Sequence, residues 1–366
     1  MGDARLLIDT LRLAPPADPG ALTAAWARAD AGALVRLAEY EGVELWLHRR
    51  LKALDVALDG VPGQRLAALA KRAVAQSLRV DAETAAALDT LGRAGIPAVP
   101  IKGAAMRRLA ARVAYADARA PNDVDLLVPA EAAQRAWDAL VAHGYSAPRE
   151  TGPPDGHHLP ALVGPVGVGV ELHLTTVAAV PPAEAWRRAT GDGAGADVGA
   201  HSRPAPSDTE LLWHAVAHAL VHAQEAARFG ARLRYWLDAA ALLASGAAID
   251  WERIRDRLDS PETPRPALAR AWLAAAAGLS GRALPAGALG TGTAPAFDVE
   301  RLVSWRLRVF AGGAPDGRWP TRLIEEGARG EALLPPEPGR AGASAGARLR
   351  HALAARAARL WWILRR

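Results

Sequence analysis

The chain has 366 residues, no cysteine and a net charge of +5 at pH 7. The absence of cysteine excludes disulfides and thiolate metal sites, and the charge surplus is too modest at this length to indicate a nucleic-acid-binding protein. No stretch reaches the roughly 18 apolar residues that cross a bilayer, and residues 1–5 do not begin a secretory signal. We therefore expect a cytoplasmic protein without a transmembrane segment, built as one large domain or as two to three smaller ones.

Three regions follow one another along the chain. Residues 1–90 are predicted to be helical, because apolar residues recur with a spacing near 3.6 in segments such as 33–38 and 43–47. Residues 91–180 alternate short apolar runs with helical segments. Residues 181–366 return to helix, with connections rich in Gly and Pro. The expected fold is α+β, with a small mixed β-sheet core between N-terminal and C-terminal helical regions.

A candidate phosphate-binding turn lies at the start of the central region. An apolar run at residues 96–101 is followed directly by Lys102, Gly103 and Ala104 and then by a segment rich in Ala and Arg, a pattern that predicts strand, tight turn and helix. Glycine lets the backbone approach a phosphate, and a helix N-terminus offers free N–H groups to an anion. Lys102 adds a positive charge, although an ordinary turn with an exposed lysine fits the same residues.

Residues 122–128 predict a buried strand that begins with two carboxylates. Successive strand side chains point to opposite faces, so Asp123 and Asp125 share one face while Val124 enters the core. Two like charges about 6–7 Å apart repel each other unless a cation lies between them. Because Mg²⁺ binds carboxylate oxygens together with substrate phosphates, the pair is a candidate Mg²⁺ site. A strand end with two solvated acids is the alternative.

A third carboxylate follows on a second predicted strand. Residues 131–143 predict a helix ended by Gly144, and residues 166–174 predict an alternating strand with Glu171 and His173 on one face. Three acids on neighbouring strands can hold two divalent cations, one that activates the attacking oxygen and one that stabilises the leaving phosphate. A solvent-facing glutamate is the alternative. His173 is interpreted as supporting a carboxylate, contacting substrate or packing structurally.

The next predicted helix carries three histidines. Ser207 or Asp208 is a candidate N-cap, and His214, His218 and His222 follow at a spacing of four, which places them along one helical face. No glutamate lies between the first two, so the pattern does not favour zinc. A role facing the substrate is expected instead.

Three further features complete the chain. Residues 151–156 predict a turn-rich loop near the third acid that is able to cover the pocket. Asp238 lies one turn after Arg234, and it is expected to act as a cap or to pair with Arg234. Residues 348–366 predict a basic amphipathic helix. Docking of this helix on the protein is favoured over binding to a membrane surface or to nucleic acid, because most amphipathic helices bury their apolar stripe against a core.

Together these motifs resemble the uncharacterised bacterial nucleotidyltransferase family, a branch of the polymerase-β-type nucleotidyltransferase superfamily. The resemblance departs from the superfamily at the turn, where a Gly-Ser or Gly-Gly pair normally precedes the Asp-x-Asp strand by a shorter segment. Lys102 and Arg119 are therefore expected to take over the binding of the triphosphate. The matching segments are residues 99–105, Tyr115, Arg119, residues 123–128, 143–145, 170–173 and 206–212, the helix through His218, and residues 233–238.

The resemblance implies Mg²⁺-dependent nucleotidyl transfer, with Mn²⁺ as a possible substitute and an NTP such as ATP as donor. An acceptor hydroxyl would attack the α-phosphorus and release pyrophosphate. Asp123 and Asp125 would bind both metal ions, and Glu171 would complete the one that activates the acceptor. A small molecule, peptide or protein is favoured over nucleic acid as the acceptor. Two alternatives stay open: transfer of another phosphate-activated group, such as a sugar from a nucleotide sugar, and nucleotide binding without catalysis.

Overall fold

The computed structural model describes residues 2–147, 157–176, 180–191, 206–224, 232–260, 263, 266–290 and 299–311. The predicted loop at 151–156 and the basic segment at 348–366 lie outside these residues. The described part of the chain is mostly helical around one small mixed sheet, which confirms the expected α+β class. None of its helices combines the length and the apolar character that crossing a bilayer requires.

The sheet has four strands in the order β1-β2-β4-β3. The two central strands run parallel, and each edge strand is antiparallel to its neighbour. Pro97 and Pro100 fit this arrangement, because β1 is a short edge strand in which a missing N–H is tolerated. The strands are β1 (Val99–Pro100), β2 (Asp123–Leu127), β3 (Leu162–Val163) and β4 (Gly169–His173).

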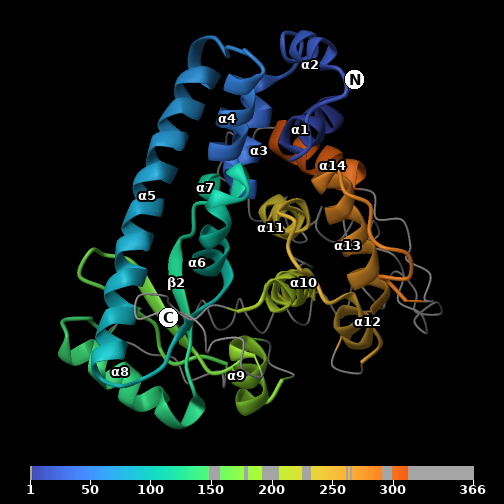
Figure 1. Cartoon of the computed structure of the whole chain (residues 1–366). Coiled ribbons are helices and arrows are strands. Elements are labelled where there is room, and N and C mark those ends of the chain that lie inside the picture. The colour runs from blue at the N-terminus through green and yellow to red at the C-terminus, as the bar shows by residue number, and fades with distance from the viewer. Residues whose placement is uncertain are drawn as a thin grey trace, which may run out of the picture.

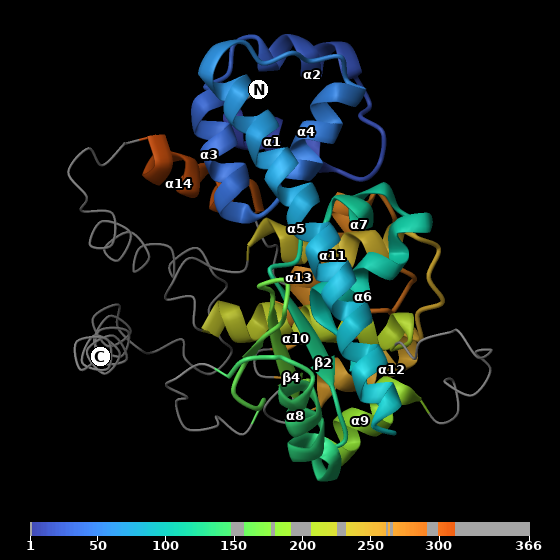
Figure 2. The ribbon, with the colours of Figure 1, turned by 90° about the vertical axis from the view of Figure 1, so that its left-hand side faces the viewer.

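Two helices cover one face of the sheet. The long helix α5 (Gly60–Arg93) runs along one side of the molecule from the N-terminal helices to α8 (Ala133–Ala142), as Figures 1 and 2 show. Alternate residues of β2, Val124 and Leu126, pack in one buried cluster with residues from both helices. Alternation along β2 therefore turns the side chains of the remaining positions to the opposite face. Gly144 follows α8 with a φ of +94°, as expected of the glycine that ends a helix.

The remaining helices form a second and larger hydrophobic cluster. This cluster joins residues from the N-terminal helices, from the segment after β1 and from the C-terminal half of the chain. The predicted boundaries at residues 90 and 180 stay predictions. In space, the N-terminal and C-terminal helical regions share one hydrophobic cluster. The helices are α1 (Asp3–Leu11), α2 (Pro19–Trp26), α3 (Ala31–Glu41), α4 (Glu44–Ala53), α7 (Ala114–Ala118), α10 (Asp208–Gln224), α11 (Leu233–Ala244), α12 (Trp251–Asp259), α13 (Pro266–Ser280) and α14 (Val299–Ala311).

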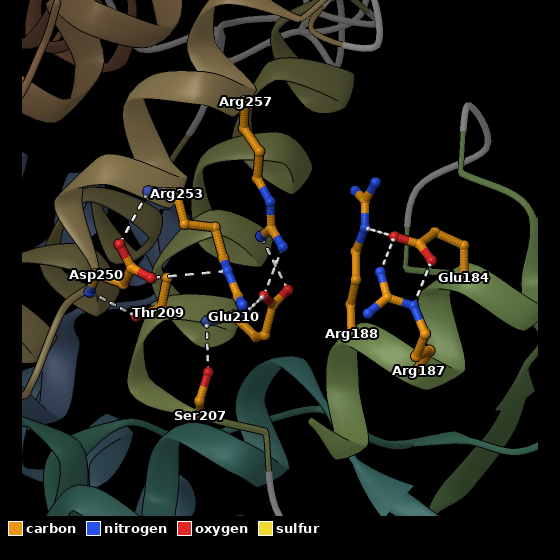
Figure 3. Close-up of polar contacts among 9 residues, drawn as sticks. All are labelled: Glu184, Arg187, Arg188, Ser207, Thr209, Glu210, Asp250, Arg253 and Arg257. Carbon is orange, nitrogen blue, oxygen red and sulfur yellow. Dashed lines mark hydrogen bonds and ion pairs between the residues drawn. The ribbon is translucent and has the colours of Figure 1, made fainter. Parts of the chain in front are cut away.

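Helices α10 and α11 lie across β2 from α5. In Figure 1, α6 (Lys102–Met106) and β2 stand between α5 and the α10–α11 pair, and α10 contacts α6 while α11 contacts α7. The sheet face that α5 leaves uncovered is thus turned toward the helical half of the chain. Helix α9 (Pro182–Thr190), at the bottom of Figure 1, carries the two arginines bound to Glu184 in Figure 3.

Polar contacts fix the first turn of α10 against α12 (Figure 3). The Ser207 hydroxyl accepts the Glu210 N–H at 3.2 Å, so Ser207 acts as the predicted cap. The Glu210 carboxylate binds both terminal nitrogens of Arg257, at 2.5 and 2.9 Å, in a buried bidentate pair. The N–H of Asp250 donates to the Thr209 hydroxyl at 2.8 Å. The first turn of α10 is therefore held by α12 and by the residue before α12.

Candidate functional site

The parallel pairing of β2 with β4 brings two predicted acids side by side. Asp125 is the register partner of Glu171, and both side chains leave the sheet on the same face. His173 Nε2 lies 2.8 Å from Asp125 Oδ1 and 3.3 Å from Glu171 Oε2, so one imidazole bridges the two carboxylates. Within the described residues these three side chains form a group whose ligand atoms all lie within 4.8 Å of one another.

Lys102 lies against the same group. The Ile101 N–H donates to the Asp125 backbone oxygen at 3.0 Å, which anchors the end of β1 beside β2. The Lys102 ammonium lies 2.6 Å from Asp125 Oδ1 and 4.0 Å from Glu171 Oε2. Its backbone has a φ of +48°, a conformation that costs a non-glycine residue about 1–2 kcal/mol. Such strain is found at functional sites, and here it places a positive charge between two carboxylates.

Asp123 lies on the pocket side of the same strand, outside the group of three ligand atoms. Burial and repulsion from Asp125 and Glu171 raise the pKa of Asp123 above its ordinary value. Burial also acts to raise the pKa of Asp125, but the His173 hydrogen bond and the Lys102 charge together hold it well below its ordinary value. Nearby positive groups therefore balance the charge of Asp125 better than that of Asp123, and a cation bound near Asp123 would be favoured.

The donor set fits a divalent cation. Carboxylate oxygens are the ligands that Mg²⁺ prefers, and Mn²⁺ accepts the same oxygens as well as an imidazole nitrogen. Asp125 and Glu171 offer such oxygens within one small volume, and His173 Nε2 lies close enough to both to hold them in place. The raised pKa of Asp123, caused first by burial and then by repulsion from Asp125 and Glu171, is the second observation in favour of a cation.

The predicted turn at Gly103 packs closely against the segment before β2. A Cβ atom at Gly103 would lie 2.9 Å from Pro121 Cβ and 3.4 Å from both terminal nitrogens of Arg119. Glycine is thus required for packing at this position. Lys102 and Gly103 line the pocket described below, whereas Ala104 lies one residue further along α6, outside that lining. Phosphate binding by this turn stays a prediction.

Arg119 is engaged in a buried ion pair. Its side chain is 6% exposed, and its Nε lies 3.0 and 3.2 Å from the two carboxylate oxygens of Asp238. The Tyr115 hydroxyl also donates to Asp238, at 3.0 Å. The expectation that Asp238 pairs with Arg234 is therefore wrong: Asp238 is buried toward α7, where Arg119 and Tyr115 meet it. Binding of the triphosphate by Arg119 stays a prediction, because its charge is already balanced.

A pocket of about 280 Å³ lies between the two aspartates of β2 and the helical half, and Glu171 lies outside its lining. The β-sheet side contributes Lys102, Asp123 and Asp125, and α10 contributes His214 and His218. The role expected for these histidines, facing the substrate, is compatible with this place in the lining; the side chain of His222 lies outside the described residues. From α11 come Arg234, Tyr235 and Asp238.

The pH dependence of stability should reveal the environment of His214. Burial lowers the pKa of His214 to about 3, whereas an unfolded histidine titrates near 6.5. Between these values the unfolded state binds a proton that the folded state does not, so stability falls as pH falls. The free energy of unfolding of the wild type should drop by about 2 kcal/mol more between pH 7 and pH 5 than that of His214→Gln. Urea unfolding at both pH values measures this difference; an equal drop in both proteins would contradict it.

Transfer of a phosphorus-containing group requires two things from a protein: positive charge near phosphate oxygens, and a rigid set of oxygen ligands for a cation. The Lys102 turn and the β2–β4 pair supply both features on one face of a small mixed sheet. The fold and the site together are those of a protein that transfers phosphorus-containing groups. A family model described as "Uncharacterised nucleotidyltransferase" matches residues 27–277. The chain belongs to this family and is a transferase of phosphorus-containing groups. No curated protein and no solved structure matches it.

Sequence reasoning left one part of the site open and missed another. Support of a carboxylate was one of three roles expected for His173, and the structure places its imidazole against both Asp125 and Glu171. The ion pair between Arg119 and Asp238 had no local signal, because the two residues lie in different regions of the chain. Only the packing of α11 on α7 brings them together.

Proposed function

We propose that this protein transfers a nucleoside monophosphate from an NTP to an acceptor hydroxyl, with release of pyrophosphate, in a reaction that depends on Mg²⁺ or on Mn²⁺ in its place. The observation that carries the proposal is the meeting of Asp125, Glu171 and His173 within 4.8 Å beside the pocket. Membership of the nucleotidyltransferase family supports the same chemistry. A small molecule, peptide or protein is the proposed class of acceptor.

Each side chain has a proposed role. Asp123, Asp125 and Glu171 hold the divalent cation, which when bound activates the acceptor oxygen and neutralises phosphate charge. His173 donates its Nε2 hydrogen to the carboxylates and orients them, as groups behind metal ligands commonly do. Lys102 leaves Asp125 once the cation arrives and turns to the phosphate oxygens.

The proposed step is an in-line displacement. The acceptor oxygen forms a bond to the α-phosphorus, while the bond from the α-phosphorus to the bridging oxygen breaks. Pyrophosphate leaves with that electron pair, and the hydroxyl proton passes to water. Positioning of the two reactants and stabilisation of the developing charge supply most of the acceleration in such chemistry.

The function is tested by turnover and by the mass of the product. Calorimetry with Mg²⁺ and each NTP identifies the donor, and pyrophosphate release is then followed across candidate acceptors. An acceptor that gains the mass of a nucleoside monophosphate supports the proposal. A hexose increment would support transfer from a nucleotide sugar, and tight binding without turnover on any acceptor would support a non-catalytic module.

If a bound cation displaces Lys102 from Asp125, a substitution of Lys102 should have opposite effects on the binding of Mn²⁺ alone and of Mn²⁺ with tripolyphosphate. Lys102→Met should tighten the binding of Mn²⁺ alone by at least about tenfold, because a competing positive charge leaves the carboxylates. The same variant should bind Mn²⁺ with tripolyphosphate more weakly than the wild type does, because a phosphate contact is lost. Electron paramagnetic resonance of free Mn²⁺ measures both constants. Lys71→Met, an exposed lysine on α5, is the matched control; equal Mn²⁺ binding by all three proteins would exclude the exchange.

A further inference from the structure

The charged side chains of the pocket are unevenly paired. Lys102 is compensated by Asp125, and Arg119 by Asp238. Arg234 also lines the pocket. Among the described residues, no carboxylate oxygen lies within 4.0 Å of its guanidinium nitrogens, the limit for an ion pair. Arg234 therefore brings to the α11 side of the pocket a positive charge that makes no direct ion pair. Glu44 is an electrostatic partner, whose pKa Arg234 acts to lower against the larger raising effect of burial.

The Arg234 side chain is held in place although its charge is unpaired. Its stem packs against the end of α3, where a Cβ atom at Gly42 would lie 3.0 Å from Arg234 Cδ. One terminal nitrogen donates to the Tyr235 hydroxyl at 3.2 Å, and the guanidinium carbon lies 5.1 Å from the centroid of that ring. The Tyr115 hydroxyl binds the backbone oxygen of Arg234 at 3.1 Å. The guanidinium is thus prepositioned by packing.

The Nε atom of Arg234 is buried and has no hydrogen-bond partner in the described structure. A buried donor without a partner costs roughly 1–3 kcal/mol, and more when it is charged. Arginine presents Nε and one terminal nitrogen as a fork that matches two oxygens of a carboxylate or a phosphate. Nε packs toward the end of α3, 3.7 Å from the position of a Cβ atom at Gly42. An anion in the pocket would therefore meet the terminal nitrogens of Arg234 and neutralise the charge, and a small turn of the guanidinium would add the Nε contact.

We propose that Arg234 is an anion-binding residue of the pocket, which binds a phosphate or carboxylate group of the ligand. His214, on the neighbouring wall, is kept neutral by burial and does not compete for the anion. Two sources have this chemistry: the phosphate chain of the donor, and an anionic group on the acceptor. The inference rests on the pocket being the substrate site of the proposed function, but its test requires only binding.

Mn²⁺-tripolyphosphate and inorganic phosphate are the probes, because neither depends on knowing the base of the donor or the identity of the acceptor. Calorimetry compares the wild type with Arg234→Met. If Arg234 binds the donor, the variant should lose about 10–100-fold in affinity for Mn²⁺-tripolyphosphate, the range expected for a charged hydrogen bond. If it binds the acceptor, tripolyphosphate affinity is unchanged, and the binding of phosphate to the tripolyphosphate-saturated wild type is lost in the variant.

Two variants keep the test decisive. Arg232→Met is the matched control, since Arg232 lies two residues away over the Tyr40 ring and outside the pocket lining. Arg234→Lys keeps the charge without the fork, and it should recover only part of the affinity. The proposal is overturned if the Arg234→Met protein is folded and binds both probes like the wild type. Failure of the proposed function would look different, since the wild type would then bind tripolyphosphate and release no pyrophosphate from any NTP.

Discussion

Replacing Asp125 with Asn should weaken the binding of Mn²⁺ at least about 100-fold, because groups behind metal ligands already contribute 10–100-fold and Asp125 is proposed as a ligand itself. The side chain is 2% exposed and holds hydrogen bonds with both Lys102 and His173. Asparagine keeps the shape and one oxygen acceptor, yet it removes the negative charge. Nucleotidyl transfer should fall with metal binding. Titration of Mn²⁺ by electron paramagnetic resonance measures the affinity in the presence of tripolyphosphate.

Two controls separate loss of the site from loss of the fold. Asp59→Asn removes an exposed carboxylate that makes no cap hydrogen bond before α5, and it should bind Mn²⁺ like the wild type. The Asp125→Asn protein should keep its far-ultraviolet circular dichroism, because Val124 and Leu126 still anchor β2 in the core. Mn²⁺ binding of wild-type strength in a folded Asp125→Asn protein would remove Asp125 from the metal site.

Local patterns along the chain predicted the sheet face that carries the acids. Alternation alone placed Asp123 and Asp125 on one face and Glu171 with His173 on another strand, since a side chain's face depends only on its own strand. The pairing of β2 with β4 was then expected from neighbouring strands, and the register puts Asp125 opposite Glu171. The short apolar run before Lys102 likewise predicted the strand and the turn.

The helical half of the site was beyond sequence reasoning. Which residue of α11 faces the pocket depends on how that helix packs on α7 and α10, and one sequence contains no signal for such distant contacts. A spacing of four suggested that Asp238 pairs with Arg234, but the gain from such a pair on a helix surface is only about 0.2–0.5 kcal/mol. A buried pair with Arg119 and a Tyr115 hydrogen bond outweighs it.

These distant contacts explain how a sheet with acids acquires a pocket. Arg108 and Arg112, which follow the Lys102 turn, bind Asp208 at the start of α10. Arg119, which precedes β2, binds Asp238 of α11. Both walls of the pocket are thus tied to the segment between β1 and β2. This segment thus carries contacts that hold the helical half beside the aspartates.

Replacing Asp238 with Leu should therefore destabilise the protein by about 3–5 kcal/mol, the range for removing one partner of a buried ion pair. Arg119 would be left as a buried charge without its carboxylate, and the Tyr115 hydroxyl would lose an acceptor. Urea unfolding followed by tryptophan fluorescence measures the change, because Trp236 is buried in the same helix. A loss below about 1 kcal/mol, the level of an exposed pair, would show that the pair is solvated.

The double variant Arg119→Met with Asp238→Leu separates structure from function at this pair. Removing both charges together should restore most of the stability, because a buried ion pair and apolar side chains of similar volume are often equivalent. If Arg119 serves only to hold α11 in place, the stable double variant binds Mn²⁺-tripolyphosphate like the wild type. If Arg119 also grips the triphosphate, as we expect from the departure at the turn, affinity falls although the fold is intact. Arg119 lines the pocket within reach of both roles, and only a protein that keeps its stability can tell them apart.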